Sequence, residues 1–318
     1  MASRAGFPVS LRSDVREYID AEFKAYEPLY PKIFHVGTSN RQSEVDAGVT
    51  GIGNLVETAE LAPVTYEDPI EIPKTTYVHK KYSKAIQVSQ EAVDDDQQNM
   101  WQARARKLGR AAARAVDVYA FSVFRNGFNT GFTGFDGDPL FSTLHTPANG
   151  GTDQSNASAT GATLSEPNLE VGWNALQEVL DDQGNIISIG LGDLILMVPP
   201  KLRKEALAIS QSELIPQSAN NDINVYRGIF TVVVNPYLSA LQAVTEVGGT
   251  AGSDTAWYLL SPSEHFLNVI MRQQPMLEDD MDFDTGNLKV KISSRFSFGW
   301  SHWVGVWGSL GNGVPYAS

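Results

Sequence analysis

The 318-residue sequence contains no cysteine, and only 19% of its residues are charged. The absence of cysteine excludes disulfide bonds, thiolate metal sites and a cysteine nucleophile. No hydrophobic run reaches the roughly 18 residues that a membrane-spanning helix requires, and no apolar signal segment follows the first four residues. We therefore expect a soluble protein without a membrane partner, whose stability comes from packing and association.

Basic residues are also in the minority. The sequence has 24 Lys and Arg against 37 Asp and Glu, which gives a net charge of −13. This balance disfavours tight, sequence-specific binding of DNA. The length exceeds the usual size of one compact core, so we expect two domains or one domain with extensions.

Motifs for catalysis and cofactor binding are scarce. Gly190-Leu191-Gly192 precedes a strand pattern, whereas a dinucleotide-binding loop follows one, and no Walker-type lysine loop is present. The histidines are scattered, with no pair at helical metal-ligand spacing. They are His35, His79, His145, His265 and His302. We expect no cofactor, no metal site and no enzymatic activity.

Two clusters leave alternatives open. Asp136, Ser142 and His145 are close enough to suggest a hydrolase triad, but without a strand-turn-helix nucleophile elbow a loop clamped by side-chain hydrogen bonds is favoured. The acidic run from Glu278 to Asp284 could hold calcium. It lacks the glycine and the terminal glutamate of a known calcium loop, so a solvated turn is the simpler interpretation.

An apolar stripe predicts one long helix over residues 97–126. Steps of three and four residues connect Trp101, Ala105, Leu108, Ala112, Ala115 and Tyr119. Asp94, Asp95 and Asp96 precede the helix, and Asn126-Gly127 predicts a left-handed exit. The window holds six basic residues and one acid, so its basic stripe either contacts phosphates or pairs with neighbouring acids.

The first ninety residues contain few apolar side chains to bury. Residues 1–54 are expected to form an extended arm, with a short helical pattern from Val9 that ends before Pro28. Residues 55–89 read as a long hairpin, in which Thr76, Val78 and Tyr82 share one face. A strand over residues 70–89 would be roughly 65 Å long, so we expect a projecting ribbon that requires a partner.

The middle of the chain predicts an α/β unit. Ser165 is a good N-cap for a helix with Leu169, Trp173, Leu176 and Leu180 on its apolar face. Strands are expected at residues 194–198, 229–234 and 256–260, and a helix after Pro199-Pro200. The tail returns to strand periodicity from Leu288 to Trp300, and its last aromatic stretch, with Trp303 and Trp307, is expected to pack on the long helix.

This order of features resembles the major capsid proteins of tailed bacteriophages, which have the Hong Kong 97-type fold. The segment from Phe135 to His145 is similar to the Mu-like major head subunits, as are residues 194–200 and 232–238. The resemblance covers most of the chain, from about residue 55 to residue 307. It implies an α+β fold with an N-terminal arm (1–54), an extended loop (55–92), a peripheral domain (93–162, continued by 266–318) and an axial domain (163–265).

The resemblance also implies a function. The protein would assemble through pentamers and hexamers into an icosahedral shell around double-stranded DNA, located in the virion and, during assembly, in the host cytoplasm. Expected partners are further copies of the chain and scaffold, portal and decoration proteins, with a scaffold that is separate or removed. Tyr77, Lys80, Lys81 and Tyr82 are candidates for intersubunit contact, and Arg104, Arg110 and Arg114 for weak, non-specific DNA contact. A nanocompartment shell resembling an encapsulin and the hydrolase remain the alternatives.

Overall fold

The computed structural model describes most of the chain and divides it into two compact units. The described residues are 7–48, 50–60, 62–64, 66, 68, 71, 74–89, 100–190, 192–214, 223–242, 249–282 and 284–316. Unit 1 comprises the described parts of 1–44, 77–120 and 268–298, and unit 2 those of 45–76, 121–267 and 299–318. The two units are defined by compactness and do not test the five-segment division expected from the sequence, which remains a prediction.

Unit 1 contains a four-stranded sheet in the order β1-β8-β9-β4. Strand β1 (His35–Thr38) pairs in parallel with β8 (Leu267–Met281). Strand β9 (Leu288–Trp300) pairs antiparallel with β4 (Lys80–Val88) along the full length of β4. Strands β2 (Ser43–Asp46) and β3 (Thr75–Val78) form a separate two-stranded sheet.

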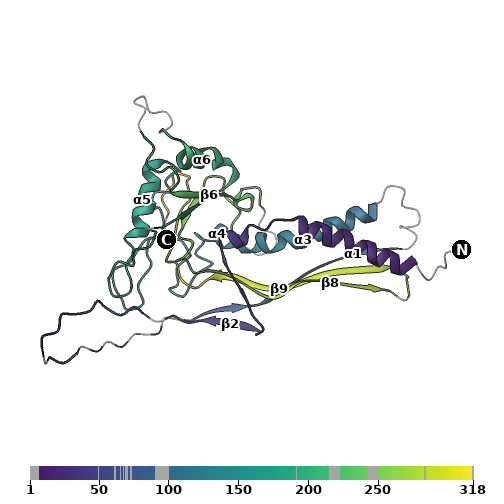
Figure 1. The fold of residues 1–318 in the computed structure, drawn as a ribbon, viewed down its shortest axis with the longest axis horizontal. Helices are drawn as coiled ribbons and strands as arrows, with labels where there is room; N and C mark the ends of the chain where they lie inside the picture. Colours follow the sequence, from purple (N-terminus) through teal and green to yellow (C-terminus); the bar gives the residue numbers. More distant parts are fainter. Residues whose placement is uncertain are drawn as a thin grey trace. The chain divides into compact units, whose positions relative to one another are not determined.

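Two helices, α1 (Phe7–Ala25) and α3 (Met100–Ala120), pack together on the unit 1 sheet (Figure 1). Their shared core contains Val15 and Ile19 of α1 and Leu108 of α3, together with apolar residues of β9. A Cβ atom at Gly109 would lie 2.6 Å from the carbonyl oxygen of Ile19, so this glycine permits the close approach of the two helices.

The first part of the predicted stripe lies in this core, since Ala105 and Leu108 are buried and Trp101 and Ala112 pack against them. Farther along α3 the buried face continues through Ala113, Val116 and Ala120, and the stripe residues Ala115 and Tyr119 are only half-buried. Much of the expected extended arm is a helix packed within its own chain.

The end of the long helix differs from the prediction. Helix α3 stops at Ala120, and a separate turn of helix, α4 (Ser122–Arg125), follows Phe121. Asn126 has a φ of −91°, so the predicted left-handed exit is wrong. Gly127 is needed instead for packing, because a Cβ atom there would lie 2.6 Å from the ring of Phe141. The aspartates at 94–96 lie outside the described residues.

The predicted projecting ribbon is wrong for residues 80–88, which form an edge of the unit 1 sheet. Tyr82 stacks on Phe296, with ring centroids 4.4 Å apart. The predicted alternation also changes phase at His79, which separates β3 from β4. Tyr77 and His79 are consequently buried, and Val78 is exposed, although Val78 was assigned to the face of Tyr82.

A buried carboxylate ties residues 26–30 to α3. Asp117 accepts hydrogen bonds from the amide of Leu29 (3.1 Å), the amide of Tyr30 (2.7 Å) and the hydroxyl of Tyr26. Burial raises the pKa of Asp117, and these three hydrogen bonds oppose the increase. Asp117, the only acid in the predicted helix window, thus holds the segment between α1 and η1 (Tyr30–Lys32) against α3.

Unit 2 contains the expected α/β unit. Its sheet has the order β10-β7-β5-β6, with β5 parallel to β6 and antiparallel to β7. All five residues of β5 are buried, as the continuous apolar run predicted. The elements are α5 (Glu166–Gln177), β5 (Leu194–Val198), η2 (Pro200–Leu202), α6 (Arg203–Gln211), β6 (Phe230–Val234), η3 (Pro236–Leu238), β7 (Trp257–Leu260) and β10 (Val306–Ser309).

The two faces of the unit 2 sheet have different covers. Helices α5 and α6 pack on the face that carries Leu196, Trp257 and Trp307. The opposite face carries Tyr258, whose ring contacts Phe124 and Phe141. The prediction that the last aromatic stretch packs on the long helix is therefore wrong for Trp307, which belongs to the core of unit 2.

The acidic run forms ion pairs within unit 1. Residues up to Met281 continue β8, and Glu278 pairs with Lys291 (2.5 Å) across to β9. Asp279 pairs with Arg16, and Asp282 with Lys289 (2.5 Å). The first part of the run is thus a strand rather than the expected solvated turn. Among the described residues, no helix has the length and apolarity to cross a membrane.

Leu108→Asp is expected to prevent stable folding. The substitution removes a buried side chain and places a charge in the core shared by α1, α3 and β9, at a cost of at least about 3 kcal/mol in the free energy of unfolding. The soluble fraction and the thermal unfolding curve measure the effect. Ala103→Asp, on the exposed side of the same helix, is the control, and equal behaviour of the two variants would contradict the assignment of the buried face.

Asp117→Asn is expected to lower the free energy of unfolding by about 1–3 kcal/mol, because an amide group cannot accept all three hydrogen bonds. Urea unfolding of the purified chain measures the change. Asp20→Asn alters an exposed aspartate of α1 and is expected to change stability by less than about 0.5 kcal/mol. An unchanged midpoint for Asp117→Asn would show that this carboxylate is dispensable.

Candidate functional site

The segment from Phe135 to His145 lies in the loop-rich part of unit 2 between α4 and α5. Gly137, with a φ of +88°, allows the turn between Asp136 and Asp138. The amides and carbonyls of His145 and Gln154 exchange two hydrogen bonds, of 2.8 and 2.9 Å. The motif is therefore a folded loop closed by its own backbone.

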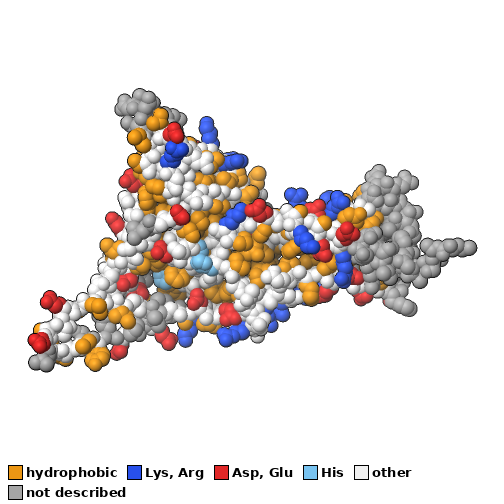
Figure 2. Space-filling view, in the orientation of Figure 1, with side chains coloured by type: hydrophobic (Ala, Val, Ile, Leu, Met, Phe, Trp, Pro, Cys, Tyr) orange, Lys and Arg blue, Asp and Glu red, His pale blue; other side chains and the backbone are white. Residues whose placement is uncertain are grey.

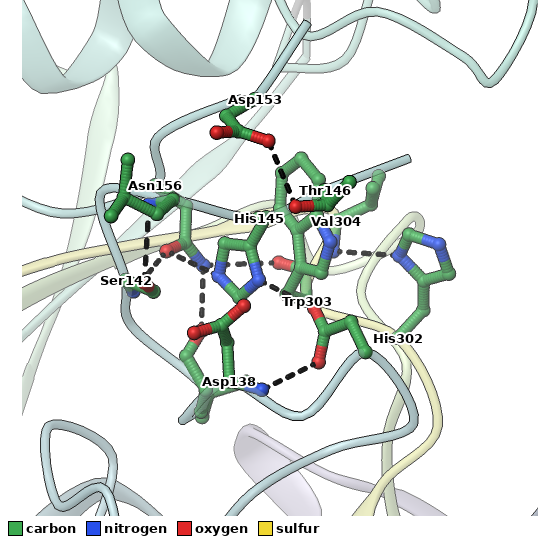
Figure 3. Close-up of polar contacts among 12 residues, drawn as sticks. Asp138, Ser142, His145, Thr146, Asp153, Asn156, His302, Trp303 and Val304 are labelled. Carbon is green, nitrogen blue, oxygen red and sulfur yellow. Dashed lines mark hydrogen bonds and ion pairs between the residues drawn. The ribbon is translucent and has the colours of Figure 1, made fainter. Parts of the chain in front are cut away.

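The imidazole of His145 occupies the centre of this loop (Figure 3). Its Nδ1 lies 2.6 Å from Oδ2 of Asp136, and its Nε2 lies 3.1 Å from Oδ1 of Asn156. The ring stacks on Trp303 at a centroid distance of 4.5 Å and an interplanar angle of 11°. The side chains of His145 and Asp136 are only 1% and 4% exposed. The ring is thus fixed by contacts at both nitrogens and on one face.

The alternative hydrolase triad is not assembled. Nδ1 of His145 contacts Asp136 and Nε2 contacts Asn156, so neither nitrogen faces Ser142. The hydroxyl of Ser142 accepts a hydrogen bond from the amide of Leu144 (3.1 Å). The Ser142 amide donates to Asn156 (2.9 Å) within the same buried network. The loop clamped by side-chain hydrogen bonds, which the sequence favoured, is the arrangement present.

Three potential metal ligands meet at this loop, although the sequence analysis predicted no metal site. One ligand atom each from Asp136, Asp138 and His145 lie within 4.8 Å of one another. Burial and the neighbouring Asp136 raise the pKa of Asp138. A search for helical ligand spacing could not find this group, because Asp138 and His145 follow Asp136 by two and nine positions and are brought together by a loop. The Asp-Gly-Asp sequence followed by a histidine was the available signal.

A cavity of about 490 Å³ lies beside this loop within unit 2. Phe135, Ile187 and Trp303 contribute apolar walls, and Asp181, Asp182 and Glu264 contribute carboxylates. His302 also lines the cavity. Burial lowers the pKa of His302 to about 4, so this ring is neutral at neutral pH and adds no positive charge to the acidic lining.

The candidate intersubunit residues fall into two groups. Tyr77 is buried, and its hydroxyl accepts a hydrogen bond from Asn268 (3.4 Å). Tyr82 packs between Tyr119 and Phe296. Both tyrosines pack inside their own chain, and their intersubunit role remains a prediction. Lys80 and Lys81 are exposed on β4, and their intersubunit role remains a prediction.

The candidate DNA-facing residues are exposed on α3. Arg104, Arg110 and Arg114 make no ion pair with another residue in the described part of the chain. Lys and Arg side chains are visible over the region of α1 and α3 in Figure 2. Ion pairs with neighbouring acids, the simpler interpretation of the basic stripe, are thus not formed by these three arginines among the described residues, and Asp94, Asp95 and Asp96 lie outside that part of the chain. The contact of the basic stripe with DNA remains a prediction.

One segment of unit 2, residues 50–66, exposes several large apolar side chains. Leu55 is 102% exposed and Tyr66 is 92% exposed, with Ile52, Val56 and Val64 between 67% and 70%. The start of the segment is attached to a turn of unit 2, because Asn54 donates a hydrogen bond to Asn185 (2.5 Å). The described residues of this segment form no helix or strand. Their apolar surface has no cover from the described part of the chain.

Known structures share this fold. The virus-like particle from Pyrococcus furiosus is 12% identical, with a TM-score of 0.51, and the match covers 93% of this chain and 98% of that one. The mature capsid of bacteriophage PhiM1 is 11% identical, with a TM-score of 0.58 and coverage of 89% and 86%. The bacteriophage JBD30 capsid is 16% identical, with a TM-score of 0.55 and coverage of 68% and 92%. The expected Hong Kong 97-type α+β fold is confirmed.

The sequence comparisons give the family. No curated protein matches the chain. A family profile described as phage capsid protein matches residues 72–308, which is well over half of the sequence. This match confirms the expected structural, shell-forming role and its place in the capsid of the virion, and it does not favour the nanocompartment or the hydrolase. The chain thus belongs to the phage capsid protein family.

Proposed function

We propose that copies of this chain assemble through pentamers and hexamers into an icosahedral shell that encloses double-stranded DNA. Scaffold, portal and decoration proteins are the proposed further partners, and assembly takes place in the host cytoplasm. The closer similarity to Mu-like head subunits, carried by the segment from Phe135 to His145, belongs to the same proposal.

The exposed apolar segment, residues 50–66, is the observation that supports assembly most directly. Five large apolar side chains among its described residues are at least two-thirds exposed in the single chain. Burying such surface stabilises an assembly by roughly 25 cal/mol per Å². Contact with a neighbouring copy provides the cover that the chain itself does not. Many weak contacts of this kind hold each subunit to several partners at once.

Weak contact with packaged DNA is proposed for α3. Arg104, Arg110 and Arg114 are exposed on one helix and form no ion pair among the described residues, whereas the whole chain carries −13. Contacts between such arginines and phosphates are sensitive to salt and independent of base sequence. A shell wall of this kind retains DNA without a tight grip, which is compatible with packaging and release.

Leu55→Asp is expected to block shell formation without unfolding the chain, because Leu55 is fully exposed in the single copy. Sedimentation and negative-stain microscopy measure assembly, and circular dichroism reports on folding. Thr58→Asp adds the same charge at a polar position of the same segment and is the control. Normal shells from Leu55→Asp would show that this side chain has no part in assembly.

Replacing Arg104, Arg110 and Arg114 together by Gln is expected to weaken binding of the unassembled protein to duplex DNA. If all three contact phosphates, the slope of log K against log salt becomes shallower by about 2.7. Fluorescence anisotropy at several salt concentrations measures it. Arg227→Gln removes an exposed arginine that pairs with Glu213 in unit 2 and serves as the control. An unchanged slope in the triple variant would place the DNA contact elsewhere.

A further inference from the structure

The hydrogen bonds around Asn156 fix the protonation of His145. The side-chain Nδ2 of Asn156 donates to the carbonyl of Leu140 (2.7 Å), and its Oδ1 accepts from the amide of Ser142 (2.9 Å). The amide group therefore has a single orientation, with its oxygen toward His145. Because that oxygen can only accept, Nε2 of His145 must carry a proton and donate to it across 3.1 Å.

This arrangement leaves Nδ1 of His145 facing a carboxylate. A neutral imidazole with a proton on Nε2 has a lone pair on Nδ1, and this atom lies 2.6 Å from Oδ2 of Asp136. Two acceptor atoms at this distance repel each other unless a positive ion lies between or beside them. The other oxygen of Asp136 accepts from the amide of Asp138 (3.2 Å), which holds the carboxylate in place.

A second carboxylate adds negative charge to the same point. The side chain of Asp138 is partly buried and accepts no hydrogen bond within the described part of the chain. The ligand oxygen of Asp138 lies within 4.8 Å of the ligand atoms of Asp136 and His145. A proton shared by His145 and Asp136 would neutralise only one of the two carboxylates. A divalent cation neutralises both while the imidazole stays neutral.

We propose that Asp136, Asp138 and His145 bind a divalent transition-metal ion, with Nδ1 of His145 and one oxygen of each aspartate as ligands. A mixed nitrogen and oxygen donor set is typical of Zn²⁺ and its neighbours, whereas Ca²⁺ and Mg²⁺ favour oxygen ligands alone. The proton that Nε2 donates to a carbonyl oxygen is the usual outer contact of a metal-binding histidine. Here Asn156 supplies that oxygen.

The geometry requires only small movements of the ligand atoms. In a tetrahedral site with ligands about 2.1 Å from the ion, two ligand atoms lie about 3.4 Å apart. The three ligand atoms are within 4.8 Å of one another, so the farthest pair approaches by at most about 1.4 Å. Nδ1 of His145 and Oδ2 of Asp136, now 2.6 Å apart, separate by about 0.8 Å. Trp303 stacks on the His145 ring and keeps its plane fixed. The ion would thus fasten the turn at residues 136–138 to the segment that carries Trp303.

Zinc binding by the full-length protein tests this site. After removal of metal with a chelator, the wild-type chain is expected to take up one equivalent of Zn²⁺, measured by calorimetry and elemental analysis, and to unfold at a higher temperature with Zn²⁺ than without. Ca²⁺ at the same concentration is expected to give no such shift. Asp138→Asn breaks no side-chain hydrogen bond, so it is expected to fold normally and to bind Zn²⁺ at least tenfold more weakly.

Asp153→Asn is the matched control. Asp153 is a nearby acid that hydrogen-bonds to Thr146 (2.8 Å) and is not among the three ligands, so its variant is expected to bind Zn²⁺ as the wild type does. Two results would overturn the site. If the wild type binds Zn²⁺ no more tightly than Asp138→Asn does, a proton alone neutralises the His145–Asp136 pair. If Asp153→Asn weakens Zn²⁺ binding as much as Asp138→Asn does, the ion is attracted by the acidic residues in general and not bound at this site.

Discussion

Several large apolar side chains remain exposed in a single copy of this chain, and burying them requires contact with another molecule. Each compact unit has a dense core of its own, around Leu108 in unit 1 and around Trp257 in unit 2. The segment of residues 50–66 belongs to neither core, yet it carries Leu55 and Tyr66 almost completely exposed. Membership of the phage capsid protein family agrees with such a surface, and we propose that another subunit covers it.

The sequence predicted the elements whose evidence is local. The continuous apolar run at 194–198 predicted β5 because a strand covered on both faces needs no polar alternation. Pro199-Pro200 marked the start of the next helical segment, and the stripe through Leu108 predicted the buried face of the first half of α3. In each case residues close together in the sequence are sufficient to predict the element.

The errors concern contacts between residues far apart in the chain. Val15 and Ile19 looked too few to order the N-terminal segment, because the sequence does not show that Gly109 lets α1 approach α3 closely. Residues 80–88 resembled a free ribbon because their partner, β9, lies about two hundred residues later. Asp117 looked like a stray acid among bases, although its hydrogen-bond donors lie some ninety residues earlier.

The loop around His145 shows the same division between local and distant information. Its residues suggested a hydrogen-bonded loop, and the contact with Asp136 is within reach of sequence reasoning. The stacking partner Trp303 is not, because its position depends on how the tail returns to unit 2. The orientation of Asn156 depends on the folded backbone at Leu140 and Ser142, and it decides which nitrogen of the His145 ring carries a proton.

The backbone around Asn156 also protects one border of the unit 2 sheet. Gly308 of β10 donates to the carbonyl of Asn156 and accepts from the amide of Ser158, so the loop lies along the outer side of the last strand in the order. Edge strands with unpaired backbone groups can pair with strands of other molecules. Because the amide and the carbonyl of Gly308 are both bonded to the loop, this part of β10 cannot add a strand from another molecule, and contacts with other copies there would be made by side chains.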